Sequence, residues 1–116
     1  MNESNGWLRL DYGFPEHRKV IGLSDAAFRA HVEAMAWSGR SRTDGHLPAG
    51  AVARHASPKV RAALVDAGVW DALPDGSYVI HDWAEYQPPT DPAERARWFA
   101  ADRQRRYRGN RRDRDA

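Results

Sequence analysis

The apolar positions in the middle of the chain predict two short helices. Pro48 suits the first turn of a helix that runs to about His55, because a proline there gives up an amide hydrogen that would have no partner. Ser57 and Pro58 start a second helix in the same way, with the serine as N-cap, and Gly68 ends it. Only His55, Ala56 and Ser57 lie between the two helices. So short a connection predicts that the helices cross at a steep angle, as in a helix-turn-helix.

The second helix has an apolar stripe and a basic face. Its stripe, at helical spacing, consists of Val60, Ala63, Leu64 and Ala67. The other face carries Lys59 and Arg61 near the N-terminal end. A recognition helix would bring such side chains to phosphate or to a base edge.

A hairpin is predicted after this helix. Asp75 and Gly76 lie between two runs rich in aromatic and β-branched residues, which is typical of a hairpin turn, and this hairpin would be the wing. The alternation of residues 78–83 does not decide which face of the second strand is buried. The buried face carries either Tyr78 and Ile80, or Val79, His81 and Trp83.

The N-terminal third predicts a strand and a helix. Residues from Trp7 to Phe14 alternate as in a half-buried strand. Ser24 caps a helix from Asp25 to about Ser38, which Gly39 ends. The apolar face of that helix consists of Phe28, Val32, Met35 and Ala36, with His31 beside it as a packing residue rather than a ligand.

Residues 1–87 are predicted to form one domain, and residues 88–116 are predicted to form an appendage at its C-terminal end. Gln87 to Thr90 is predicted to be a linker, and Asp91 caps a new helix. This helix has one narrow apolar face, which consists of Ala96, Ala100 and Tyr107, with Phe99 beside them, and Trp98 lies off it. The face either docks on the domain or forms the seam of a homodimer. From about Gly109 onward we expect a frayed or disordered tail unless an anion binds.

Charge is divided into blocks along the chain. The net charge of +2 is made up of −1 in residues 1–39, +4 in 40–61, −7 in 62–94 and +6 in 95–116. Residues 103–114 include seven arginines. The tail could serve solubility alone, but arginine pairs with phosphate through two points, so we favour nucleic-acid contact. The candidate nucleic-acid-binding residues are Arg40, Arg42, Arg54, Ser57, Lys59, Arg61, Arg103, Arg105, Arg106, Arg108, Arg111 and Arg112.

The expected wing carries neither Lys nor Arg, and phosphate would repel the acidic block around it. DNA is therefore expected to meet one face that carries the basic residues of the helix-turn-helix, Arg40, Arg42, Arg54, Lys59 and Arg61. The acidic wing would turn away from DNA or contact a protein.

Three tracts resemble the N-terminal winged-helix domain of phage and plasmid replication-initiation or replisome-organiser proteins, the DnaD-like group, in the version common on actinobacterial phages and prophages: TDGHLPAGAV, a helix ending in DAGVW, and DGSYVIHDWAEYQ. The opening WLRLDYGFPEHRKVIGLSDAAFRAHVEAMAWSGR fits the same pattern, so the resemblance covers most of residues 7–87. It implies an α+β winged helix-turn-helix that binds double-stranded DNA near an origin and recruits replication proteins.

Two alternatives to a role in replication initiation stay open. One is a transcriptional regulator on the same scaffold. The other is a protein-interaction module, in which the acidic wing contacts a replisome or polymerase protein and DNA is not the main ligand.

Enzyme, metal and membrane functions are not expected. Adjacent strand residues point to opposite faces, so His81 and Asp82 should not form a catalytic dyad. There is no cysteine, and the five histidines lack metal-ligand spacing, so we expect no metal site and no cofactor. No stretch suits a signal peptide or a membrane span, which favours a cytoplasmic protein.

Overall fold

The computed structural model describes the backbone of residues 6–115 and the side chains of residues 6–109, and it has an α+β fold. Its described elements are a 3₁₀ turn η1 (Phe14–Glu16), α1 (Asp25–Ser41), β1 (His46–Leu47), α2 (Ala49–His55), α3 (Pro58–Asp66), β2 (Trp70–Ala72), β3 (Tyr78–Ile80), α4 (Trp83–Tyr86) and α5 (Pro92–Asp115). The strands form one antiparallel sheet in the order β1-β3-β2. None of the described helices has the length and apolarity needed to cross a membrane.

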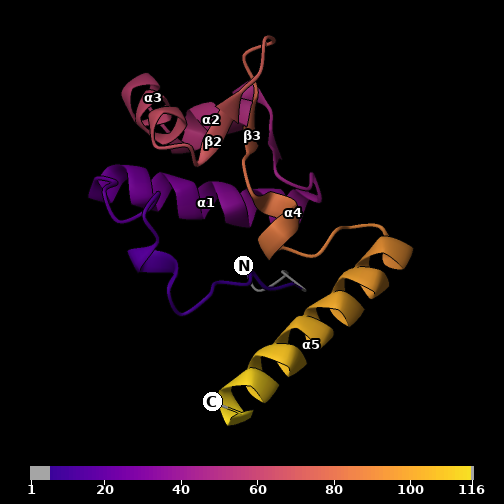
Figure 1. Cartoon of the computed structure of the whole chain (residues 1–116). Coiled ribbons are helices and arrows are strands. Elements are labelled where there is room, and N and C mark those ends of the chain that lie inside the picture. The colour runs from indigo at the N-terminus through magenta and orange to yellow at the C-terminus, as the bar shows by residue number, and fades with distance from the viewer. Residues whose placement is uncertain (1–5, 116) are drawn as a thin grey trace.

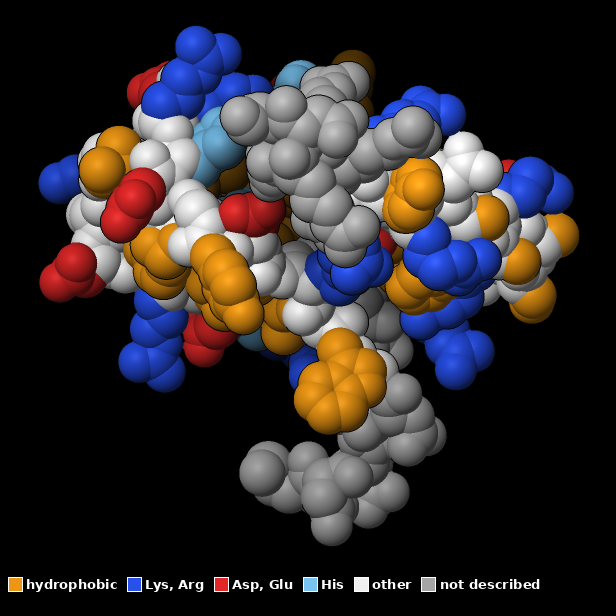
Figure 2. Space-filling model, turned by 60° about the horizontal axis from the view of Figure 1, so that its bottom comes forward, with side chains coloured by type: hydrophobic (Ala, Val, Ile, Leu, Met, Phe, Trp, Pro, Cys, Tyr) orange, Lys and Arg blue, Asp and Glu red, His pale blue; other side chains and the backbone are white. Residues whose placement is uncertain are grey.

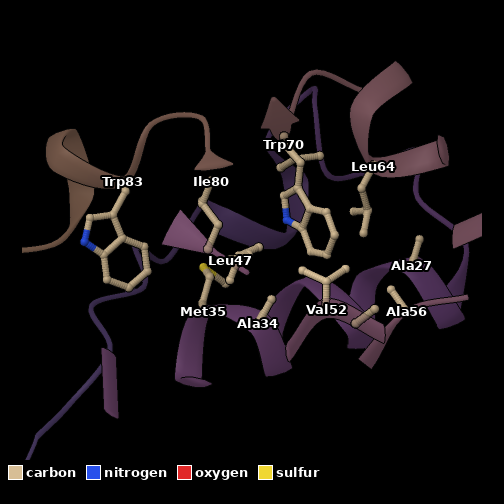
Figure 3. Packing of buried hydrophobic residues seen from close by; sticks show 12 residues of the cluster. Ala27, Ala34, Met35, Leu47, Val52, Ala56, Leu64, Trp70, Ile80 and Trp83 are labelled. Carbon is tan, nitrogen blue, oxygen red and sulfur yellow. The ribbon is translucent and has the colours of Figure 1, made fainter. Parts of the chain in front are cut away.

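Helix α1 lies across the middle of the molecule (Figure 1). The sheet, α2 and α3 lie on one side of it, whereas the N-terminal segment and α5 lie on the other. The core fills the space between α1 and the sheet (Figure 3). Leu64 lies near Ala27 at one end of this core, and Ile80 and Trp83 lie near Met35 at the other.

The buried face of α1 differs from the predicted one. Met35 is buried as expected, but the predicted Phe28, Val32 and Ala36 are only partly buried. The residues that α1 buries are Ala27, Ala30, His31, Ala34, Met35 and Ser38. Small side chains at these positions let α2, α3 and the sheet approach α1 closely, which apolar size alone did not indicate.

Helix α1 also runs past Gly39, which was predicted to end it. It ends at Ser41, and Arg42 adopts the left-handed conformation at its C-cap, with φ of 57°. Ser38, fully buried, shares a hydrogen bond of 2.6 Å with the Thr43 hydroxyl and accepts one of 2.7 Å from the Gly45 amide. These bonds turn the chain from α1 into β1.

The predicted start and end of α3 are confirmed. The Ser57 hydroxyl accepts a hydrogen bond of 3.2 Å from the Val60 amide, and Gly68 follows the helix with φ of 80°. Leu64 of the predicted stripe is fully buried, but Ala63 is exposed. Pro48 precedes α2 as its N-cap rather than occupying its first turn.

The predicted hairpin is present, and its buried face is the one that carries Ile80. Trp70 of β2 pairs with Ile80 of β3, and the rings of Trp70 and Tyr78 lie 5.6 Å apart. Trp83 packs on the core as expected, but it begins α4 instead of ending β3. A Cβ at Gly45, whose φ is 93°, would lie 2.8 Å from the Cβ of Trp83, so this packing requires glycine.

The N-terminal segment is not the predicted strand. Trp7 and Tyr12 are almost fully exposed, and the segment is fixed by a side chain instead of a neighbouring strand. The Arg9 amide donates to Gln87 Oε1 at 3.0 Å, and Gln87 Nε2 donates to the Arg9 carbonyl at 2.7 Å. Gln87 is therefore a buried structural residue, and the connection to α5 begins after it.

Helix α5 begins as predicted but does not end as predicted. Asp91 Oδ2 accepts a hydrogen bond of 3.0 Å from the Glu94 amide, as the cap requires. The helix then continues to Asp115, so the prediction of a disordered tail from Gly109 is wrong for this structure. Arginine is a good helix former, and Asp102 neutralises arginines one turn further along.

Candidate nucleic-acid interface

Of the candidate residues in α2 and α3, two are freely presented to solvent. Arg54 and Lys59 are exposed, and neither forms an ion pair with another described residue. The Arg61 guanidinium is partly buried and donates to the Ala56 carbonyl at 2.9 Å, which fixes the turn between the helices. The Ser57 hydroxyl is engaged as the cap of α3.

Arg40 and Arg42 do not join this group. They lie at the C-terminal end of α1, while α3 packs over the other end, where Leu64 faces Ala27 (Figure 3). Arg40 lies 13 positions after Ala27, which corresponds to about 20 Å along the helix axis. The length of α1 therefore separates the residues of the predicted basic face into two groups, and their contact with one DNA surface stays a prediction.

The hairpin tip is acidic and points away from α5 (Figure 1). Asp75 Oδ1 accepts a hydrogen bond from the Ser77 hydroxyl and another, of 3.0 Å, from the Ser77 amide. These bonds to Ser77 hold the pKa of Asp75 below its ordinary value, so this carboxylate is ionised at neutral pH. The hairpin therefore adds no attraction for phosphate.

One side of α5 docks on the body of the protein. Trp98 donates from Nε1 to the Ala84 carbonyl at 2.9 Å, and the Arg9 guanidinium lies 5.1 Å from the centre of its ring system. Arg9 also forms an ion pair of 3.1 Å with Asp102, which is 8% exposed. The predicted apolar stripe thus does not form the docked side, because Trp98, placed off the stripe, makes the contact.

Asp102 also engages two of the candidate arginines. Arg105 Nη2 donates to Asp102 Oδ1 at 3.3 Å, and Arg106 Nε donates to Oδ2 at 3.0 Å. Burial alone would raise the pKa of Asp102, but the hydrogen bond from Arg106 and the charge of Arg9 outweigh it and lower that pKa. Part of the positive charge of α5 is therefore compensated within the protein.

The other side of α5 carries arginines without such compensation. Arg97, Arg103 and Arg108 are exposed, and helical geometry at 100° per residue places them within about 140° of arc. Asp102, the only acid between residues 95 and 109, lies on the docked side. We call this surface the outer face of α5; its described members include Ala96, Arg97, Ala100, Arg103, Gln104, Tyr107 and Arg108.

In Figure 2 most of the visible Asp and Glu side chains lie at the left of the view, whereas Lys and Arg side chains lie both there and at the right, where α5 lies. Arg97 was missed by the sequence analysis, although its angular distance from Asp102 in the helix could have identified it. The side chains of Arg111 and Arg112 lie outside the described part of the protein.

His81 and Asp82 lie closer together than neighbouring residues of a strand would. His81 Nδ1 lies 2.7 Å from Asp71 Oδ2, and its Nε2 lies 3.5 Å from Asp82 Oδ1. The argument from strand alternation fails here because β3 ends at Ile80. Within the described residues, no group of three His, Asp or Glu side chains is arranged to hold a metal ion.

Comparison with protein-family models, with curated proteins and with solved structures found no match to this chain.

Proposed function

We propose that this protein is a double-stranded DNA-binding winged-helix protein of the phage or prophage type, acting in replication initiation. The observation that carries the proposal is the outer face of α5, where exposed arginines lie together and none of the three described ones, Arg97, Arg103 and Arg108, forms an ion pair with another described residue. Such a surface attracts the phosphate backbone and gives affinity that does not depend on base sequence.

The order of elements supports the winged-helix part of the proposal. Helix α1, strand β1, the closely spaced helices α2 and α3, and the hairpin β2-β3 follow one another as in that scaffold. Lys59 is exposed at the N-terminal end of α3, where recognition helices contact DNA. The role in replication rests on the resemblance of residues 7–87 to replisome-organiser proteins.

The dimensions of α5 also suit a duplex. Its 24 residues span about 36 Å, close to one turn of B-DNA. Ala96 and Ala100 separate the arginines of the outer face and allow a close approach to the DNA backbone. The major groove is wide enough to admit an α-helix.

The proposal is tested by titrating a labelled 20-base-pair duplex with the full chain at several salt concentrations. In the variant Arg103→Gln/Arg108→Gln, the slope of log K against log salt should become less negative by about 2, because two phosphate contacts are lost. The control Arg18→Gln/Arg29→Gln makes the same change in net charge at exposed positions away from α5 and should retain the parental slope.

Equal slopes in the two variants would remove α5 from the interface. A parent chain that does not bind the duplex in dilute salt would overturn the function itself and favour a protein partner for the acidic hairpin. The positions of genomic fragments that the protein binds distinguish the two roles. Fragments from an origin would indicate replication initiation, and fragments from promoters would indicate transcriptional regulation.

A further inference from the structure

The outer face of α5 has a shallow groove that contains an aromatic side chain. Tyr107 is 65% exposed and lines this groove together with Ala100, Arg103, Gln104 and Arg108. Residues three or four positions apart are neighbours on a helix, so these side chains form one continuous surface around the ring. Within the described part of the chain, no aromatic ring pairs with Tyr107 and no guanidinium lies over it. Its ring is therefore open to a ligand.

The two arginines of the groove lie on either side of this ring. With about 100° of turn per residue, Tyr107 lies about 40° from Arg103 and about 100° from Arg108, in opposite directions around the helix. Arg103 and Arg108 are about 7.5 Å apart along the helix axis. Neither forms an ion pair with another described residue. A planar group stacked on the ring would therefore have a free cation on each side.

Gln104 adds a polar group to the groove. Its Oε1 accepts a hydrogen bond of 3.4 Å from Arg108 Nη2, and its Nε2 donates to no other described residue. Nucleic-acid bases present oxygen and nitrogen acceptors at their edges when they are unpaired. The amide of Gln104 is a donor in the groove for such an edge. The groove thus combines the three kinds of group that hold a nucleotide: an aromatic ring, an amide and cations.

The aromatic ring distinguishes a single strand from a duplex. In a duplex the faces of each base are covered by its neighbours, and unstacking one step costs on the order of a few kcal/mol. An unpaired strand offers these faces without that cost, and stacking of one base on an aromatic side chain contributes about 1–3 kcal/mol. Arginines alone attract the phosphates of both forms, so Tyr107 is the residue that adds affinity for the single strand only.

We propose that the outer face of α5 also binds single-stranded DNA, with one unpaired base stacked on Tyr107 and the flanking phosphates held by Arg103 and Arg108. This inference rests on the proposed function, because the same arginines hold phosphate in both cases. It adds unpaired DNA to the ligands of this face.

The test measures binding of the full chain to a labelled oligothymidine of about 12 nucleotides and to the duplex used above, by fluorescence anisotropy in dilute salt. Tyr107→Leu removes the ring and keeps an apolar helix former. In this variant the affinity for the oligothymidine should fall about tenfold, because one stacked base is lost, whereas the affinity for the duplex should stay within about twofold. Tyr107→Phe keeps the ring and should bind both ligands as the parent does.

Two controls separate stacking from other effects. Tyr12→Leu makes the same change at a fully exposed ring of the N-terminal segment, outside α5, and should leave both affinities at the parental value. An abasic strand of the same length carries the phosphates without the bases. The parent and Tyr107→Leu should bind this strand equally, because neither can stack a base.

Equal losses of affinity for the oligothymidine and the duplex in Tyr107→Leu, or no loss for either, would overturn the stacking of a base on this residue. A tenfold loss of single-strand affinity in Tyr12→Leu as well would overturn the assignment of the site to α5. Either result leaves the duplex slopes of Arg103→Gln/Arg108→Gln and its control as separate evidence, so this inference can fail while the proposed function stands. A parent that binds neither DNA would overturn both.

Discussion

His31 is a neutral imidazole held in the core by Trp70 and stacked on Phe14, with ring centres 6.1 Å apart. Burial lowers the pKa of His31 from 6.5 to about 4. Between these two values the unfolded chain binds a proton that the folded chain excludes, so the free energy of unfolding falls as the pH decreases. The sequence predicted a satisfied packing residue here, and the bond from Trp70 confirms it.

We therefore expect the parent to lose about 2 kcal/mol of stability from this residue between pH 7 and pH 5. In His31→Gln, whose amide oxygen can still accept from Trp70, this part of the loss should vanish. Urea unfolding of both proteins at the two pH values measures the difference, and the other histidines cancel because both proteins contain them. A parent and a variant with the same pH dependence would show that His31 is protonated in the fold.

At the scale of the element, α3 carries one cation that is exposed to solvent, Lys59, and one that stabilises the fold, Arg61. Lys59 is exposed, whereas Arg61 donates to the Ala56 carbonyl in the turn before the helix. The sequence could place both on the polar side of α3, but it could not show that the turn brings a carbonyl within reach of only one of them.

Arg61→Ala should therefore lower the free energy of unfolding by about 1 kcal/mol, because a charged hydrogen bond is lost. Lys59→Ala should leave stability unchanged within about 0.5 kcal/mol and lower the salt slope of duplex binding by about 1. Chemical unfolding and duplex titration of both variants measure the two effects. A destabilised Lys59→Ala would contradict the division of roles within α3.

At the scale of the whole molecule, α5 is joined to the body through Arg9, Trp98 and Asp102. Residues 9 and 102 are far apart in sequence, and no local pattern pairs them. Asp102→Asn keeps the size of this side chain and removes the charge that Arg9, Arg105 and Arg106 share.

This variant should open the docked contact more often. Hydrogen exchange of the Arg9 amide and of the Trp98 indole should become about tenfold faster, corresponding to a loss of about 1.4 kcal/mol in the cost of opening. The control Glu94→Gln removes an exposed acid from the same helix and should exchange at the parental rate. Identical exchange in Asp102→Asn and the parent would mean that the ion pair does not hold α5.

The sequence by itself determined the local elements. Ser57 and Asp91 begin helices because their side chains accept from amides three residues ahead, and Gly76 allows the hairpin turn because its φ is 88°. These features depend on near neighbours in the chain, so a local pattern contains them. The strand predicted from Trp7 failed because a strand also needs a partner, which alternation does not supply.

Only the tertiary structure decided which basic residues lie exposed together. It placed Arg40 and Arg42 at the far end of α1, used Arg61 and Arg106 in internal contacts, and left the outer face of α5 exposed. It also paired Arg9 with Asp102. The physical reason is that a charge or a donor is available to a ligand only if folding brings it no partner. Some partners come from distant parts of the chain, as Asp102 does for Arg9, and others come within reach only when the local turn folds, as the Ala56 carbonyl does for Arg61.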